Sequence, residues 1–122
     1  MPSVPSNADN DSEVLIERRL GRRQRVFLAG KALVHDRLID VTFRDLSARG
    51  ARLIVAEPFA HAGQLPVLLL REELILRSRI VWARPPMFGL EIRDAIDIRG
   101  ACPPHLAVLT EAWRCWKMAQ TD

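Results

Sequence analysis

Hydrophobic and polar residues alternate along the middle of the chain in six short runs, which is the period of β-strands. The clearest run places Ile39, Val41 and Phe43 on one side, with Asp40 and Thr42 between them. Glycine, proline and charged residues separate the runs, as expected for turns. Six short strands in this arrangement predict a small antiparallel barrel or sandwich. The expected strands span residues 26–34, 39–44, 51–55, 65–70, 74–83 and 88–92.

Two of these runs carry a further structural prediction. Gly30 lies inside the first expected strand and favours a barrel, because glycine in a strand accommodates a sharp bend. In the fifth run, simple alternation places Trp82 on the same face as Leu76, Ser78 and Ile80. We therefore expect Trp82 to share the environment of these residues.

The two ends of the chain differ from the middle. Residues 1–13 are rich in Pro, Ser, Asn and Asp and predict disorder, and a short amphipathic turn is expected at 14–20. Near the other end, apolar residues recur at helical spacing and predict a helix over 103–119 that packs on the barrel. This apolar stripe contains Leu106, Leu109, Trp113 and Trp116. We therefore expect a flexible tail over residues 1–16 and a single domain over 17–120, with the barrel at 24–100.

Composition adds limits on the class of protein. A chain of 122 residues, 48% of them hydrophobic, has room for one domain with a modest core. Cys102 and Cys115 lack metal-binding spacing and the three histidines are isolated, which argues against zinc. No apolar run is long enough for a membrane span, and the polar start lacks a signal-peptide core. We expect a reduced, cytoplasmic protein without metal or cofactor.

Two segments carry the candidate chemistry. Five arginines crowd into residues 18–25, and the segment 45–50 reads Asp-Leu-Ser-Ala-Arg-Gly, which predicts a polar turn. Guanidinium groups bind phosphates bidentately and stack on flat rings. Arginine outnumbers lysine by sixteen to two, a bias that we attribute mainly to a GC-rich genome. Arg49 and Arg52 beside the turn are interpreted as solvated strand charges, with Arg49 in reach of a phosphate as the alternative. Together the two segments indicate an anionic, purine-containing ligand.

In their order and spacing these residues resemble the PilZ family of bacterial receptors for cyclic di-GMP. The arginine motif is Arg19-x-x-x-Arg23 or, one register earlier, Arg18-x-x-x-Arg22. The resemblance covers residues 17–100. It also rests on Asp45-x-Ser47-x-x-Gly50, Gly-Ala-Arg-Leu at 50–53, Arg-Ile-Val-Trp at 79–82 and Phe-Gly-Leu-Glu-Ile at 88–92.

The resemblance implies a six-stranded antiparallel β-barrel with a C-terminal helix and a flexible N-terminal arm that wraps around the dinucleotide. It implies that two arginines hold phosphates and stack on guanine, and that Asp45 binds the polar edge of the base. Ser47 would help to fix the base, and Gly50 would permit close backbone approach. This agrees with the chemistry, since a carboxylate accepts two N–H donors and glycine tolerates a positive φ.

The register of the arginine motif stays open between the two alternatives. We prefer Arg19 and Arg23, because the second arginine of the family usually stands just ahead of the first strand. In this register Arg18 precedes the motif, which implies an intercalated pair of ligands. In the earlier register, with Arg22 as the second arginine, Glu17 takes that place and implies one ligand.

The leading hypothesis is a bacterial sensor without enzymatic activity. Cyclic di-GMP binds, the arm orders on the barrel, and the new surface engages a protein partner. Two alternatives remain: a ligand-independent adaptor of the same fold, and a small basic barrel that binds nucleic acid. Both motifs are present, which argues against the adaptor, and the expected strands offer few exposed aromatics for stacking on bases.

Overall fold

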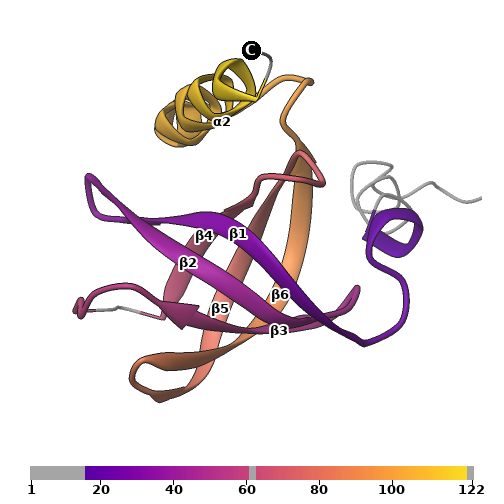
Figure 1. Cartoon of the computed structure of the whole chain (residues 1–122), viewed down its shortest axis with the longest axis vertical. Coiled ribbons are helices and arrows are strands. Elements are labelled where there is room, and N and C mark those ends of the chain that lie inside the picture. Colours follow the sequence, from indigo (N-terminus) through magenta and orange to yellow (C-terminus); the bar gives the residue numbers. More distant parts are fainter. Residues whose placement is uncertain (1–15, 61–62, 121–122) are drawn as a thin grey trace, which may run out of the picture.

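The chain folds into a closed barrel of six antiparallel strands, as expected from the alternation (Figure 1). The computed structural model describes residues 16–60 and 63–120, so most of the expected tail lies outside the described residues. The strands neighbour one another in the order β1-β2-β3-β6-β5-β4. They are β1 (Gln24–Val34), β2 (Arg37–Leu46), β3 (Gly50–Val55), β4 (Gln64–Leu69), β5 (Leu74–Arg84) and β6 (Met87–Asp97).

Alternation along the strands fills the barrel interior. In β2, Ile39, Val41 and Phe43 are buried, while Asp40 is exposed on the other face. Gly30 of β1 crosses close above Phe43, and a Cβ atom at this position would come within 2.7 Å of the ring. Glycine at position 30 therefore lets β1 pass close over the ring of Phe43.

Strand β6 is longer than its apolar pattern indicated, because it continues to Asp97 instead of ending at residue 92. Beyond residue 92 it still pairs with β5, after a register shift between Arg77 and Ser78. Asp94 lies opposite Arg77 and accepts a hydrogen bond of 2.7 Å from its Nε atom, while Ala95 is buried. Apolar alternation did not predict this extension, because polar residues occupy its outer face.

The prediction for Trp82 was wrong. Strand β5 has a second register shift between Ile80 and Trp82, so the alternation of sides breaks there. Ser78 is buried as expected, but Trp82 is 41% exposed and pairs with Gly89 of β6. The indole lies so close over Gly89 that a Cβ atom there would be 2.1 Å from the indole Nε1 atom.

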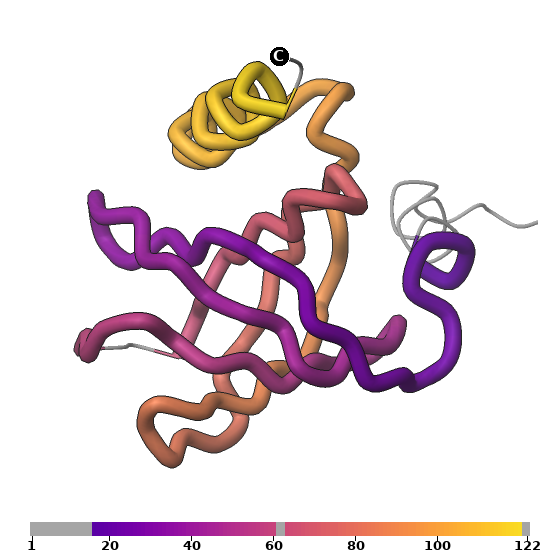
Figure 2. Tube along the Cα trace, viewed as in Figure 1, coloured from indigo at the N-terminus to yellow at the C-terminus, as the bar shows by residue number. Residues whose placement is uncertain are grey.

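Both ends of the described chain pack on the barrel (Figure 2). A helical turn at 16–19 buries Ile16 and the following Leu20 in the main apolar cluster. At the other end, a short 3-10 helix η1 (Pro104–Leu106) leads into helix α2 (Ala107–Ala119). The helix lies across one end of the barrel, as predicted. Leu106 and Leu109 are fully buried in a second apolar cluster, against which Trp113 and Trp116 are half-buried.

Candidate functional site

The turn between β2 and β3 is held by the hydroxyl of Ser47. Its Oγ atom accepts hydrogen bonds from the backbone N–H groups of Arg49 at 3.3 Å and Gly50 at 3.2 Å. The backbone N–H of Ser47 donates to the carbonyl oxygen of Gly50 at 2.9 Å. These bonds close the turn on itself, which fixes the position of Asp45 just before it.

Gly50 lies where strand β6 comes close to the turn. Its backbone has no positive φ, so the left-handed geometry that glycine tolerates is not used here. Instead, a Cβ atom at Gly50 would come within 2.9 Å of the carbonyl oxygen of Leu90 in β6. The close approach of strand β6 therefore accounts for glycine at this position.

The arginine-rich segment reaches this turn directly. Gly21 has a φ of 57°, and its carbonyl oxygen accepts a hydrogen bond of 3.0 Å from the backbone N–H of Ala48. The positive φ turns the chain after the helical turn at 16–19 and leads it into β1. Two segments far apart in the sequence thus meet, and Arg23 comes to lie beside Asp45 and Ser47.

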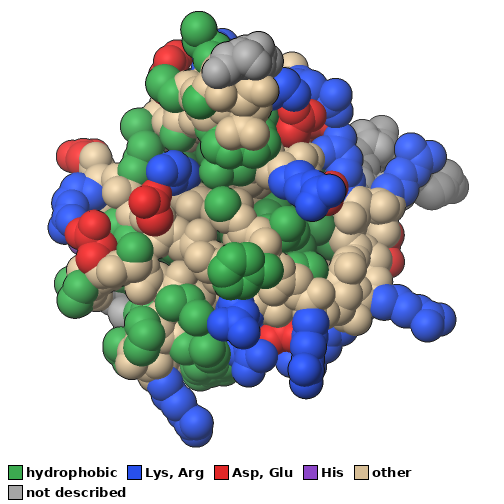
Figure 3. All heavy atoms as spheres, in the orientation of Figure 1, with side chains coloured by type: hydrophobic (Ala, Val, Ile, Leu, Met, Phe, Trp, Pro, Cys, Tyr) green, Lys and Arg blue, Asp and Glu red, His purple; other side chains and the backbone are tan. Residues whose placement is uncertain are grey.

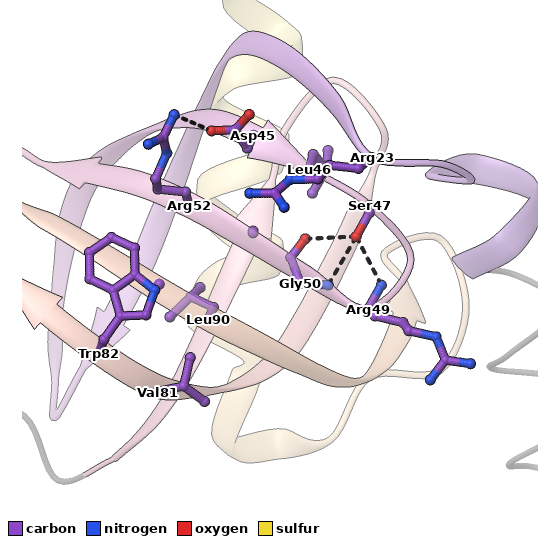
Figure 4. A pocket seen from close by; sticks show the side chains of 12 residues that line it. Arg23, Asp45, Leu46, Ser47, Arg49, Gly50, Arg52, Val81, Trp82 and Leu90 are labelled. Carbon is purple, nitrogen blue, oxygen red and sulfur yellow. Dashed lines mark hydrogen bonds and ion pairs between the residues drawn. The ribbon is translucent and has the colours of Figure 1, made fainter.

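These residues line a surface hollow of about 320 Å³ (Figure 4). Its floor is formed by residues that lie opposite one another in neighbouring strands. Asp45 pairs with Arg52, Arg52 pairs with Gly89, and Gly89 pairs with Trp82, which makes one row across β2, β3, β6 and β5. Arg23 closes one side of this row and Ser47 lies next to it.

Asp45 is the buried charge of the hollow. It is 7% exposed and forms an ion pair with the guanidinium group of Arg52, whose side chain is 42% exposed. The contact joins the Oδ2 atom of Asp45 to a terminal nitrogen of the Arg52 guanidinium, so this oxygen is held by the ion pair. A guanidinium has five N–H donors, so the exposed part of Arg52 keeps donors for a ligand at the hollow.

Three other arginines of the segment lie elsewhere, whereas Arg25 stands opposite Asp45 in the register of β1 and β2 without lining the hollow. Arg19 donates to Asp97 Oδ2 at 3.0 Å and to the backbone carbonyl of Glu72, at the end of the barrel near helix α2. Arg18 and Arg22 are exposed to solvent and do not line the hollow. Of the four arginines in the two alternative registers, the structure brings only Arg23 to Asp45.

Asp97 is strongly held by its surroundings. The side chain and backbone of Arg99 donate to its carboxylate, with the backbone N–H at 2.9 Å, and Arg19 adds a second positive charge. Hydrogen bonding from Arg99 keeps the pKa of Asp97 below its usual value, with a smaller coulombic contribution from Arg19. The ion pair therefore ties the arginine-rich segment to the far end of β6.

Two residues of the hollow were missed in the sequence. Arg52 was interpreted as a solvated strand charge, although it pairs with the buried Asp45. Trp82 was placed on the wrong face. A usable signal was Gly89, because glycine inside a strand often marks the close approach of a bulky neighbour. A second hollow of about 530 Å³ adjoins the first and is lined by Arg52, Trp82, Arg84 and Met87.

The surface around the hollow has no metal-binding character within residues 16–60 and 63–120, where no three His, Cys, Asp or Glu side chains gather. Lys and Arg side chains project around the edge of the face shown in Figure 3, between patches of hydrophobic side chains. Over the same described ranges, no helix combines the length and the apolar character needed to cross a membrane. The arrangement offers charged and aromatic groups for binding an anionic, aromatic ligand.

Comparison with known proteins agrees with the barrel and its turn. The family model of the PilZ domain matches residues 17–100, which include all six strands and the turn at 45–50. A search of the curated proteins finds no match for the chain. Because the family model covers most of the chain, from the arginine-rich segment to the end of β6, the chain belongs to the PilZ domain family.

Proposed function

We propose that the protein is a receptor for cyclic di-GMP and has no enzymatic activity of its own. The observation that carries this proposal is the buried carboxylate of Asp45. It pairs with Arg52 in a hollow that Arg23, Ser47 and Trp82 also line. Membership of the PilZ family supports a receptor of this class.

The chemistry of the hollow suits a guanine nucleotide. A carboxylate is an acceptor only, and the Watson–Crick edge of guanine presents two adjacent donors, N1–H and the N2 amino group. The guanidinium of Arg23 provides forked donors for a phosphate, and the half-exposed indole of Trp82 provides a flat surface for stacking. A hollow of about 320 Å³ is of the size expected for a small-ligand site.

Signalling would proceed through the arginine-rich segment. Its helical turn packs on the barrel through Ile16 and Leu20, and Gly21 bonds to the turn that holds Ser47. A ligand bound to Arg23 would therefore act on the position of this segment. We infer that a protein partner binds the changed surface. The partner and the receptor would act in the cytoplasm of a bacterium, because the chain resembles bacterial receptors.

Isothermal titration calorimetry with cyclic di-GMP tests the proposal. The wild-type chain is expected to bind with micromolar or tighter affinity. Arg23→Ala and Asp45→Ala should each weaken binding by roughly 10-fold or more, since each removes a charge-assisted contact. Arg114→Ala is the matched control for the loss of a positive charge, because Arg114 lies on helix α2 and pairs with Glu111 at 2.7 Å.

A wild-type chain that takes up no cyclic di-GMP would show the proposal to be wrong. Equal weakening by Arg114→Ala would also contradict it, since affinity would then follow net charge rather than the hollow. The partner is sought by affinity capture on the immobilised chain with and without cyclic di-GMP. A protein captured only with ligand, and lost in Asp45→Ala, is the expected result.

A further inference from the structure

Arg52 and Asp45 together form a paired acceptor and donor in the wall of the hollow. They lie opposite each other in the register of β2 and β3, and Figure 4 shows the guanidinium of Arg52 directed toward the carboxylate of Asp45. The Oδ2 atom of Asp45 contacts Arg52, and the guanidinium of Arg52 has further N–H donors on a side chain that is 42% exposed. The pair therefore presents a carboxylate acceptor next to guanidinium donors, both in a fixed position.

Guanine carries the complementary pattern along one edge. Its N1–H and N2 amino groups are donors, and its O6 atom next to N1 is an acceptor that arginine commonly binds. Adenine presents the reverse order, with an acceptor at N1 and a donor amino group at C6. An adenine in the same position would place its N1 lone pair against the carboxylate and its amino group against the guanidinium.

We propose that Arg52 is a specificity-determining residue that selects guanine over adenine by binding O6 while Asp45 binds N1–H and the N2 amino group. This inference rests on the proposed function and assigns Arg52 a role in the same site. Arg52 also holds the carboxylate of Asp45 in place, since their ion pair joins two neighbouring strands. A guanidinium is suited to this task because its fork keeps donors for a ligand after it has paired with a carboxylate.

The position of Arg52 supports this assignment over a purely structural role. Its side chain is 42% exposed and lines both hollows, so it is accessible to a ligand although its Nε atom is buried. One terminal nitrogen of the guanidinium contacts Asp45, and the exposed part of the group leaves hydrogen-bonding capacity for a base.

The test compares the affinities for cyclic di-GMP and cyclic di-AMP, measured by calorimetry, in three variants. Arg52→Met keeps most of the side-chain volume and removes all donors. It should weaken cyclic di-GMP binding by roughly 10- to 100-fold, change cyclic di-AMP binding little, and so reduce the selectivity. Arg52→Lys keeps the charge but not the fork, and should lose selectivity to a smaller extent. Arg79→Met is the control, because it removes the same charge from the adjacent outer surface without lining the hollow.

Unchanged selectivity and affinity in Arg52→Met, within about twofold in a chain that binds cyclic di-GMP, would overturn the inference and leave the proposed function intact. An equal loss in Arg79→Met would overturn it too, since the effect would then be one of net charge. A wild-type chain that binds neither dinucleotide would instead overturn the proposed function itself. Circular dichroism establishes folding of each variant. If Arg52→Met does not fold, Arg52→Lys decides the question, because it keeps a positive charge next to Asp45.

Discussion

Leu20 is the main anchor of the arginine-rich segment on the barrel. It is 3% exposed and belongs to the main apolar cluster, and replacing a buried leucine by alanine costs about 2–5 kcal/mol. The other ties of the segment are Ile16, the hydrogen bond from Ala48 to Gly21, the hydrogen bond from Arg19 to the carbonyl oxygen of Glu72, and the ion pair of Arg19. A typical hydrogen bond contributes about 0.5–1.5 kcal/mol and a partly exposed ion pair about 0–1 kcal/mol.

The change Leu20→Ala therefore removes a contribution about as large as that of all the polar ties together. A single helical turn is not stable by itself in water, so the segment should detach locally while the closed barrel stays folded. Since detachment removes Arg23 from the hollow, binding of cyclic di-GMP should weaken along with it. The expected result is a local opening at residues 16–23 with little change in the strands.

Hydrogen exchange measured by mass spectrometry distinguishes local from global effects. In Leu20→Ala, peptides covering 16–23 should exchange much faster than in the wild type, including the amide of Leu20 that donates to Ile16 at 2.7 Å. Leu109→Ala is the matched control, because Leu109 belongs to helix α2 and is fully buried in the second cluster. Unchanged protection of 16–23 in Leu20→Ala, with a global destabilisation like that of Leu109→Ala, would refute the reasoning.

Three further predictions concern the hollow and its surroundings. Gly89→Ala should displace the indole of Trp82 and cost about 1–3 kcal/mol in unfolding free energy, measured by urea denaturation; a fully stable variant would contradict the close packing. Ser47→Ala removes the acceptor of two turn N–H groups and should cost about 1–3 kcal/mol, measured in the same way against Ser78→Ala as a buried serine control. Because the pKa of Asp97 is lowered in the fold, its contribution is present above about pH 4 and is lost as the pH falls through the folded value. Thermal unfolding of Asp97→Asn should therefore show a deficit at neutral pH that disappears in acid, and a deficit independent of pH would argue against this origin.

The strands could be predicted because each strand of a closed barrel has one face toward the interior and one toward solvent. Successive residues therefore alternate between buried and exposed positions. Ile39, Val41 and Phe43 carry this pattern without interruption. Trp82 could not be placed in this way, since a register shift interrupts the alternation of faces before it. Such a shift depends on the partner strand, so local alternation alone does not reveal it.

The site could be predicted only in part for a related reason. Asp45 and Ser47 belong to one short turn, whose motif is visible in consecutive residues. Arg52 lies opposite Asp45 through the register of two strands, and a register is set by long-range pairing rather than by residue type. Arg19 contacts Asp97 across 78 positions, and this contact arises from the closure of the barrel.

The separation of Arg19 from Arg23 has a physical cause and a consequence for the proposed function. Residues four apart lie on the same side of a helix, but here the helical turn ends before Gly21, whose positive φ sends the chain in a new direction. A ligand held by both arginines would have to replace the pair between Arg19 and Asp97, whose side chains are 22% and 30% exposed, and the hydrogen bond from Arg19 to the carbonyl oxygen of Glu72. The pair is worth about 0–1 kcal/mol, and a hydrogen bond from Arg19 to a phosphate, at about 1.5–3 kcal/mol, would match the one lost at Glu72. Since Asp97 would keep its bonds from Arg99, the exchange leaves no carboxylate unpaired, and the present position of Arg19 is compatible with its recruitment to a phosphate.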